Sequence, residues 1–188
     1  MLRLHDIEQT VVEADIKKYL TDALSSMSPP PSSHDVERLA KRAGRLFIYA
    51  ATAIRYIRPS RSVVNSHARL RSVLKTTTGS SKQHEELDNM YTGILSAVFN
   101  GHLEREELRH IQLTLKTVVC ARQAITVRTI ASLLSLEEQT VWDSLEPLRS
   151  VLLVQEGVDG LVSPFHQSFL DYIHDNERSK QFYCDPTS

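Results

Sequence analysis

The chain has 188 residues, of which 41% are hydrophobic and 6% aromatic, and its formal net charge is −1. This length suffices for one large or two small domains with a hydrophobic core. A nearly neutral chain carries no overall charge that attracts nucleic acid or a membrane surface, and no apolar run is long enough for a spanning helix. The two cysteines, Cys120 and Cys184, fit no metal-binding spacing, so we expect a cytoplasmic protein with reduced thiols.

The first segment is predicted to be a helix that follows a capping box. Thr10 supplies a hydroxyl and Glu13 a carboxylate three residues later, and apolar residues then recur at helical spacing as far as Met27. Three prolines at positions 29–31 end this helix because proline lacks the N–H donor. Residues 1–8 are a candidate for a short remnant strand.

Three further helices are predicted before residue 76. Ser33 is expected to cap the second helix and Gly44 to end it. Residues 46–57 are apolar on nearly every side, which is typical of a helix at the centre of a bundle, so we expect the most buried helix there. A fourth helix is predicted over residues 62–75, followed by a polar loop over residues 76–83.

The second half begins with a fifth helix, which ends at Asn100–Gly101, and a sixth over residues 103–121. A helix-turn-helix follows, with Thr126 capping residues 127–134 and a second helix over residues 137–148. Two short strands are then expected at the β-branched stretches on either side of a glycine-rich turn, residues 151–154 and 161–162. Pro164 suits the first turn of the last helix, which His166 opens.

This order predicts a mainly α fold, a helical bundle followed by a winged-helix domain with a small β-hairpin. We expect a helical, lid-like domain over residues 1–100, the winged-helix domain over residues 101–176 and a tail over residues 177–188.

A helix-turn-helix suggests DNA binding, but the charges oppose it. Residues 137–149 carry one base against four acids, a net charge of −3. A recognition helix approaches phosphates, where Lys and Arg supply most of the affinity. The sequence therefore favours a winged helix that packs against protein and binds no nucleic acid.

No catalytic or metal site is predicted. None of the six glycines precedes a lysine, so the Gly-Lys-Ser/Thr core of a phosphate-binding loop is missing and ATP hydrolysis by that route is excluded. Asp171 and His174 share a helix face without a third ligand, and His84 has no second histidine at zinc-helix spacing. His166, Ser168 and Asp171 lie within six residues, but we expect Ser168 to point away from the other two, so they form no triad.

Nearly the whole chain resembles, in order, the region that follows the nucleotide-binding core in fungal NACHT-type STAND proteins. The segments that carry the resemblance are residues 15–20, 43–57, 87–95, 165–172 and 182–185. The resemblance implies a helical domain and a winged-helix domain that close over ADP bound to a preceding phosphate-binding-loop domain and hold a signalling switch off.

The resemblance also implies site residues. His166, in the sequence Phe-His-Gln-Ser-Phe, corresponds to the histidine that contacts the ADP β-phosphate, and a histidine at a helix start is a natural partner for an anion. Gly44 and Phe47 correspond to a segment near the base or ribose, although proline often stands at the position of Phe47. The chain alone is expected to need no cofactor, because ADP or ATP binds only with the missing core.

We therefore expect a non-catalytic regulatory segment of a nucleotide-dependent switch and expect it to be part of a larger protein. Its expected partner is the nucleotide-binding core, and it is expected to join an oligomer on activation. The alternative is a free-standing winged-helix adaptor that binds another protein through its helical face. A DNA-binding regulator is a remote third. For His166 there are two alternatives: it contacts an anion, or it is a helix-start histidine bonded to a neighbouring carbonyl.

Overall fold

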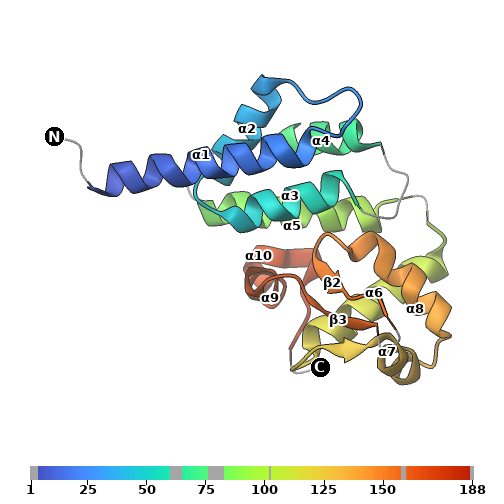
Figure 1. Cartoon of the computed structure of the whole chain (residues 1–188). Helices are drawn as coiled ribbons and strands as arrows, with labels where there is room; N and C mark the ends of the chain where they lie inside the picture. Colours follow the sequence, from blue (N-terminus) through green and yellow to red (C-terminus); the bar gives the residue numbers. More distant parts are fainter. Residues whose placement is uncertain (1–3, 60–64, 76–82, 102, 158–159, 187–188) are drawn as a thin grey trace. The chain divides into compact units, whose positions relative to one another are not determined.

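The computed structural model describes residues 4–59, 65–75, 83–101, 103–157 and 160–186, with the backbone alone at residues 4–10 and 83 (Figure 1). The described residues form ten α-helices and a small three-stranded antiparallel sheet, which confirms the prediction of a mainly helical chain. The chain divides into two compact units, residues 1–90 and 91–188. Among the described helices, none has both the length and the apolar content needed to cross a membrane.

The first unit consists of four helices and the start of a fifth. Helix α1 packs against α2 and α3, and α4 packs against the same two helices (Figure 1). Their apolar side chains form the core of this unit, with Leu20, Leu39 and Tyr49 almost fully buried. The bounds are α1 (Leu4–Leu24), α2 (Ser33–Ala43), α3 (Phe47–Ile57), α4 (Ser66–Lys75) and α5 (Gln83–Phe99), which continues into the second unit.

The start of α1 differs from the prediction. The helix already begins at Leu4, so a strand over residues 1–8 is wrong from Leu4 onward, and residues 1–3 lie outside the described part. Thr10 lies inside the helix and therefore does not cap it. Residues 4–9 contain neither proline nor glycine, so nothing in this stretch stops the helix from extending toward the N-terminus.

The caps of α2 explain where this helix begins and ends. The cap is Ser32 rather than Ser33: its Oγ accepts the Asp35 N–H at 3.1 Å and donates to the Asp35 carboxylate at 2.7 Å. Gly44 ends the helix as predicted, with φ 53° and its N–H bonded to the Ala40 carbonyl at 3.0 Å. Glycine adopts this positive φ without a steric penalty.

Helix α3 is the buried helix of the first unit, as predicted. Six of its eleven residues are buried, and no other described helix has so large a buried share. Arg69 fixes α4 to it: the guanidinium donates to the Tyr56 carbonyl at 2.7 Å and lies 4.7 Å from the centre of the Tyr56 ring. Helix α4 begins at Ser66, where Asn65 accepts the Ala68 N–H, and the predicted start at Ser62 lies outside the described residues.

The second unit combines the end of α5 with shorter helices and the sheet. Helix α6 packs against α7, α8 and β3, and α7 packs against α8 (Figure 1). The bounds are α6 (Arg105–Cys120), β1 (Ile125–Thr126), α7 (Val127–Leu134), α8 (Glu138–Leu145), the 3₁₀ turn η1 (Glu146–Leu148), β2 (Leu152–Val154), β3 (Leu161–Pro164), α9 (Gln167–Ile173), α10 (Asn176–Ser179) and η2 (Lys180–Phe182).

The sheet has the order β1-β3-β2, and both pairs are antiparallel. The predicted pair of strands is confirmed as β2 and β3. The sequence did not predict β1, because two residues are too few to show an alternating pattern. Pro164 belongs to β3, opposite Leu152, and not to the helix; the next donor along the strand is the Phe165 N–H, which bonds to the Val151 carbonyl at 2.9 Å. Proline is therefore tolerated at the end of this strand, because the hydrogen bond to the Val151 carbonyl comes from the Phe165 N–H.

Candidate functional site

His166 lies between β3 and α9 and is the N-cap of that helix. Its backbone is extended, with φ −154° and ψ 151°, which carries the chain out of the strand before the helix begins at Gln167. The Phe169 N–H bonds back to the His166 carbonyl at 3.1 Å. The side chain of His166 is exposed, so it is a helix-start histidine that a partner can reach.

Ser168 fixes the orientation of the His166 ring. The Nδ1 atom accepts the Ser168 N–H at 3.1 Å and lies 2.9 Å from the Ser168 Oγ. The prediction that Ser168 points away from His166 is therefore wrong. The reason is the cap: His166 is not in the helical conformation, so the angular spacing of helical residues does not apply to this pair.

The histidine is connected to the core of the second unit through Ser168. The Ser168 Oγ lies 2.8 Å from the hydroxyl of Tyr91, a residue that is only 1% exposed. The ring of Tyr91 packs on Phe169 and Tyr172, with centroids 5.1 and 5.4 Å apart. Tyr91 belongs to the candidate site, and the sequence could not indicate it, because 77 residues separate it from Ser168.

This hydrogen-bond chain determines what His166 offers to a ligand. Because the backbone N–H of Ser168 can only donate, Nδ1 acts as an acceptor and a neutral ring carries its proton on Nε2. Within the described part of the chain, Nε2 has no hydrogen-bond partner. The exposed Nε2–H is therefore available to donate to an anion.

Asp171 does not complete a catalytic triad with His166 and Ser168. Its carboxylate accepts the side-chain amide of Gln167 at 3.0 Å, and its carbonyl accepts a guanidinium N–H of Arg178 at 3.0 Å. Among the described residues, no group of three or more His, Cys, Asp and Glu side chains is placed to hold a metal ion.

The predicted base or ribose contacts, Gly44 and Phe47, belong to the first unit: Gly44 lies in the turn between α2 and α3, and Phe47 is the first residue of α3. The Leu46 N–H bonds to the Ala43 carbonyl at 2.8 Å, so the turn is tight and Phe47 begins the next helix. Phe47 is 46% exposed, and its ring lies against Tyr19 of α1, with centroids 6.1 Å apart. Phe47 and Tyr19 thus form part of an exposed apolar surface of this unit, whereas Gly44 is half-buried.

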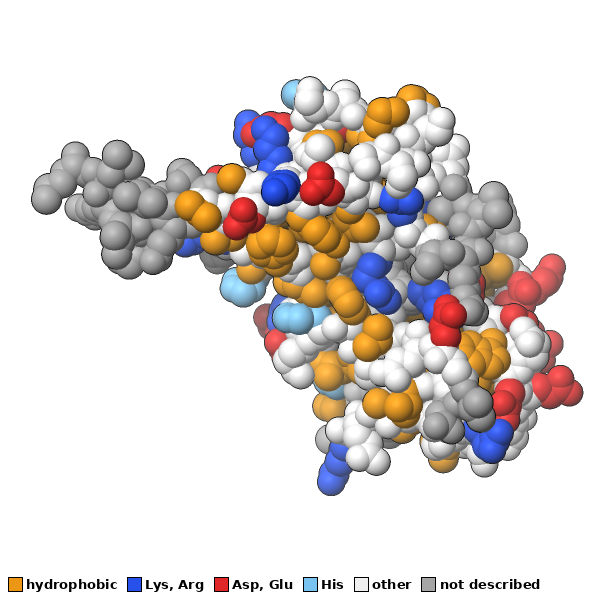
Figure 2. All heavy atoms as spheres, viewed as in Figure 1, with side chains coloured by type: hydrophobic (Ala, Val, Ile, Leu, Met, Phe, Trp, Pro, Cys, Tyr) orange, Lys and Arg blue, Asp and Glu red, His pale blue; other side chains and the backbone are white. Residues whose placement is uncertain are grey.

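Helix α8 presents an acidic surface. Glu137, Glu138 and Asp143 are exposed, and Figure 2 shows acidic side chains gathered in this part of the molecule. The one base of the predicted segment, Arg149, is engaged with Glu146 at 2.6 Å. On α7, Arg128 bonds to Glu138 at 3.2 Å. These charges work against an approach to nucleic acid phosphates.

Comparisons of the chain with protein-family models, with characterised proteins and with solved structures found no match.

Proposed function

We propose that this chain is a non-catalytic regulatory lid of a STAND, NACHT-type signalling switch. In this function the chain closes over ADP that is held by the nucleotide-binding core of its parent or of a related protein. The observation that carries the proposal is the exposed His166 ring, held by Ser168 through Nδ1 so that Nε2–H is free to donate. Such a switch works in the cytoplasm and joins an oligomer when it is activated.

The arrangement of the second unit supports a winged-helix interpretation. The strand β1 lies between α6 and α7, α8 follows α7, and the antiparallel pair β2 and β3 comes next along the chain. This is the order expected for a winged helix, with the β2–β3 turn as the wing. In the proposed lid, this domain carries His166 to the phosphate of the nucleotide.

The mechanism needs only a difference in contact between two nucleotide states. A hydrogen bond from Nε2–H to a phosphate oxygen of ADP stabilises the closed state by about 1.5–3 kcal/mol. A ligand shifts a conformational equilibrium only by its differential affinity for the two states. In ATP the β-phosphate is no longer the terminal phosphate. Exchange of ADP for ATP would therefore remove the contact between His166 and the β-phosphate, which frees the lid to open.

The experiment supplies a nucleotide-binding core as a separate protein. A STAND nucleotide-binding core is loaded with a fluorescent ADP analogue, and release of the analogue is measured with and without the chain. We expect the chain to slow release of the analogue. With the His166→Ala variant, release should be about tenfold faster than with the unchanged chain, since a tenfold change corresponds to about 1.4 kcal/mol, the size of one hydrogen bond. His34→Ala is the matched control, because His34 is also exposed and lies near the start of a helix.

If the His166→Ala and His34→Ala variants both slow release to the same extent as the unchanged chain, His166 does not contact the nucleotide. If the unchanged chain has no effect on release from cores of this class, the lid proposal as a whole fails.

A protein-binding adaptor is the second candidate function, and one observation favours it. Val11 and Phe47 are 53% and 46% exposed, and Tyr19 beside Phe47 is 36% exposed. Figure 2 shows hydrophobic side chains gathered over α1 and α3, the helices that carry them. Exposed apolar patches of this kind mark protein interaction sites. An adaptor would lose its partner on Phe47→Ser, would keep it on His166→Ala and would bind with or without nucleotide.

DNA binding stays the least favoured candidate, because the acidic surface of α8 opposes it. We expect no salt-dependent shift of a duplex DNA at physiological ionic strength.

A further inference from the structure

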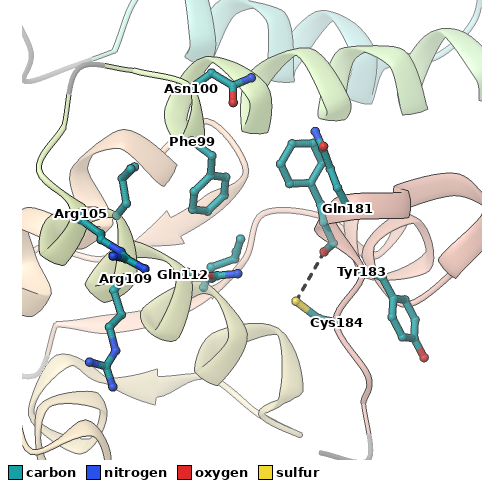
Figure 3. A pocket seen from close by; sticks show the side chains of 11 residues that line it. Phe99, Asn100, Arg105, Arg109, Gln112, Gln181, Tyr183 and Cys184 are labelled. Atoms are coloured by element: carbon teal, nitrogen blue, oxygen red, sulfur yellow. Dashed lines mark hydrogen bonds between the residues drawn. The ribbon is translucent and has the colours of Figure 1, made fainter.

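The second unit contains a cavity of about 540 Å³ that the lid function does not use. It lies where the end of α5, helix α6 and residues 181–184 come together (Figure 3). Its volume is in the range of cavities that bind small organic ligands, roughly 300–1,000 Å³. None of the residues that line it belongs to the candidate site around His166.

One part of the cavity wall is apolar. The rings of Phe99 and Phe182 are stacked, with centroids 5.9 Å apart and planes at 29°. Leu108 is half-buried and Leu115 is buried, and both line the same cavity. An aromatic ligand ring gains both area burial and an offset-stacked geometry against such a pair.

The other part of the wall is cationic. Arg105 and Arg109 lie one turn apart on α6, and Figure 3 shows both coming from the same side of the cavity. Neither guanidinium has a hydrogen bond or an ion pair with another described residue. The described lining residues include no Asp or Glu to neutralise them.

The cavity is also lined by neutral polar side chains. The side-chain amides of Gln112 and Gln181 also line the cavity. Of the acids beside Arg105 on α6, Glu107 is occupied at the helix start, where its carboxylate accepts the Glu104 N–H at 2.8 Å. The cavity thus offers two planar cationic donors beside an aromatic surface, and guanidinium groups bind carboxylates and similar acids in a bidentate manner.

We propose that this cavity binds a small aromatic acid, a carboxylate or sulfonate whose ring lies against Phe99 and Phe182 and whose acid group bonds to Arg105 and Arg109. This ligand site is independent of the proposed lid function, so the failure of either leaves the other standing.

The test uses the full chain and a matched pair of fluorescent probes. The first, 8-anilinonaphthalene-1-sulfonate, carries the acid group, and the second, N-phenyl-1-naphthylamine, has the same rings without it. We expect saturable binding of one sulfonate probe per chain. Arg105→Gln with Arg109→Gln should weaken it about tenfold or more, because the variant lacks the charge-assisted hydrogen bonds to the acid group. The affinity for the neutral probe should change less than about twofold because only ring contacts hold it.

Two further variants locate the binding. Arg122→Gln removes an exposed arginine outside the cavity and should leave both affinities unchanged. Leu108→Trp fills the cavity and should abolish binding of both probes, with a far-ultraviolet dichroism spectrum that shows the fold is kept.

The proposal is overturned if the sulfonate probe does not saturate, or if it binds the double arginine variant as tightly as the unchanged chain. Binding that survives Leu108→Trp in a folded protein lies elsewhere on the chain and overturns the proposal as well.

Discussion

His166 can serve the proposed lid only in one tautomer. Its Nδ1 accepts from Ser168, so the neutral ring must carry its proton on Nε2, which has no hydrogen-bond partner among the described residues. The opposite tautomer would place N–H against N–H at the helix start and leave only an acceptor for an incoming phosphate. The orientation of this one ring therefore decides whether the site attracts or repels an anion.

We predict that neutral His166 is in the Nε2–H form in the free chain. Long-range proton–nitrogen correlation spectra of the imidazoles distinguish the two tautomers directly. Ser168→Ala removes the hydroxyl but keeps the backbone donor, so the same form should persist with a smaller excess. An Nδ1–H form as the major species would contradict the geometry of the cap and the proposed donor together.

Cys184 is a second residue whose chemistry follows from its surroundings. Burial, and next the neighbouring Cys120, raise the pKa of its thiol from 9.0 to about 11, while Lys116 acts in the opposite direction. Burial also raises the pKa of the Cys120 thiol. Both thiols are free, so the folded protein keeps them as neutral, weakly nucleophilic groups near pH 7.

The raised pKa predicts how Cys184 reacts and how it affects stability. The neutral thiol is favoured by folding, so its stabilising contribution is complete below pH 9 and is lost as the pH rises toward about 11. The rate of alkylation of Cys184 by iodoacetamide, followed by mass spectrometry, should rise about tenfold per pH unit up to that value. Glutathione, with an unburied thiol, is the control, and a plateau for Cys184 near pH 9 would contradict the effect of burial.

Two glycines differ in whether their helix or strand needs a residue without a side chain. Gly160 leads into β3 with φ 50°, and a Cβ atom there would lie 2.8 Å from the ring of Trp142 on α8 and 3.2 Å from Val127. Gly93 lies on the exposed surface of α5, where a Cβ atom would meet nothing within 4 Å. Only the first position requires glycine.

We predict that Gly160→Ala lowers the free energy of unfolding of the second unit by about 1–3 kcal/mol, because it adds both backbone strain and a clash. Gly93→Ala should raise it by about 0.5–1 kcal/mol, because alanine is the better helix former. Urea titrations followed by the fluorescence of Trp142, the single tryptophan, measure both changes. Equal effects of the two substitutions would show that Gly160 does not approach α8 as closely as described.

The elements that the sequence predicted best are those with local signals. Thr126 caps α7 with its hydroxyl on the Thr129 N–H at 3.0 Å, and the predicted bounds of this helix are confirmed. Gly44 and the apolar stretch of α3 were confirmed for the same reason, because one residue type or one repeat determines them.

The features that the sequence missed depend on contacts between distant residues. The strand β1 exists because Ile125 and Thr126 meet Val162 and Leu161 across the sheet. The bond between Tyr91 and Ser168, and the stacking of Phe99 on Phe182, join segments that are far apart along the chain. In the candidate site, the position of His166 at a helix start followed from the sequence, but the direction of its ring did not.

At the scale of the whole molecule, the chain divides into two units, and the candidate nucleotide contacts are shared between them. Gly44 and Phe47 belong to residues 1–90 and His166 to residues 91–188. A segment that contributes single contacts and lacks a phosphate-binding loop has little affinity for a nucleotide of its own. We therefore predict that the purified chain hydrolyses no ATP, measured as phosphate release; turnover that copurifies with the chain through successive columns would contradict this.

In the proposed function, the chain recognises which nucleotide a separate nucleotide-binding core holds. The most direct measurement is the affinity of the chain for a STAND nucleotide-binding core loaded with ADP, with a non-hydrolysable ATP analogue or with no nucleotide, by titration calorimetry. We predict that the chain binds the ADP-loaded core about tenfold more tightly, or more, than the other two forms, and that His166→Ala loses this preference whereas His34→Ala keeps it. Equal affinity for all three forms would contradict it.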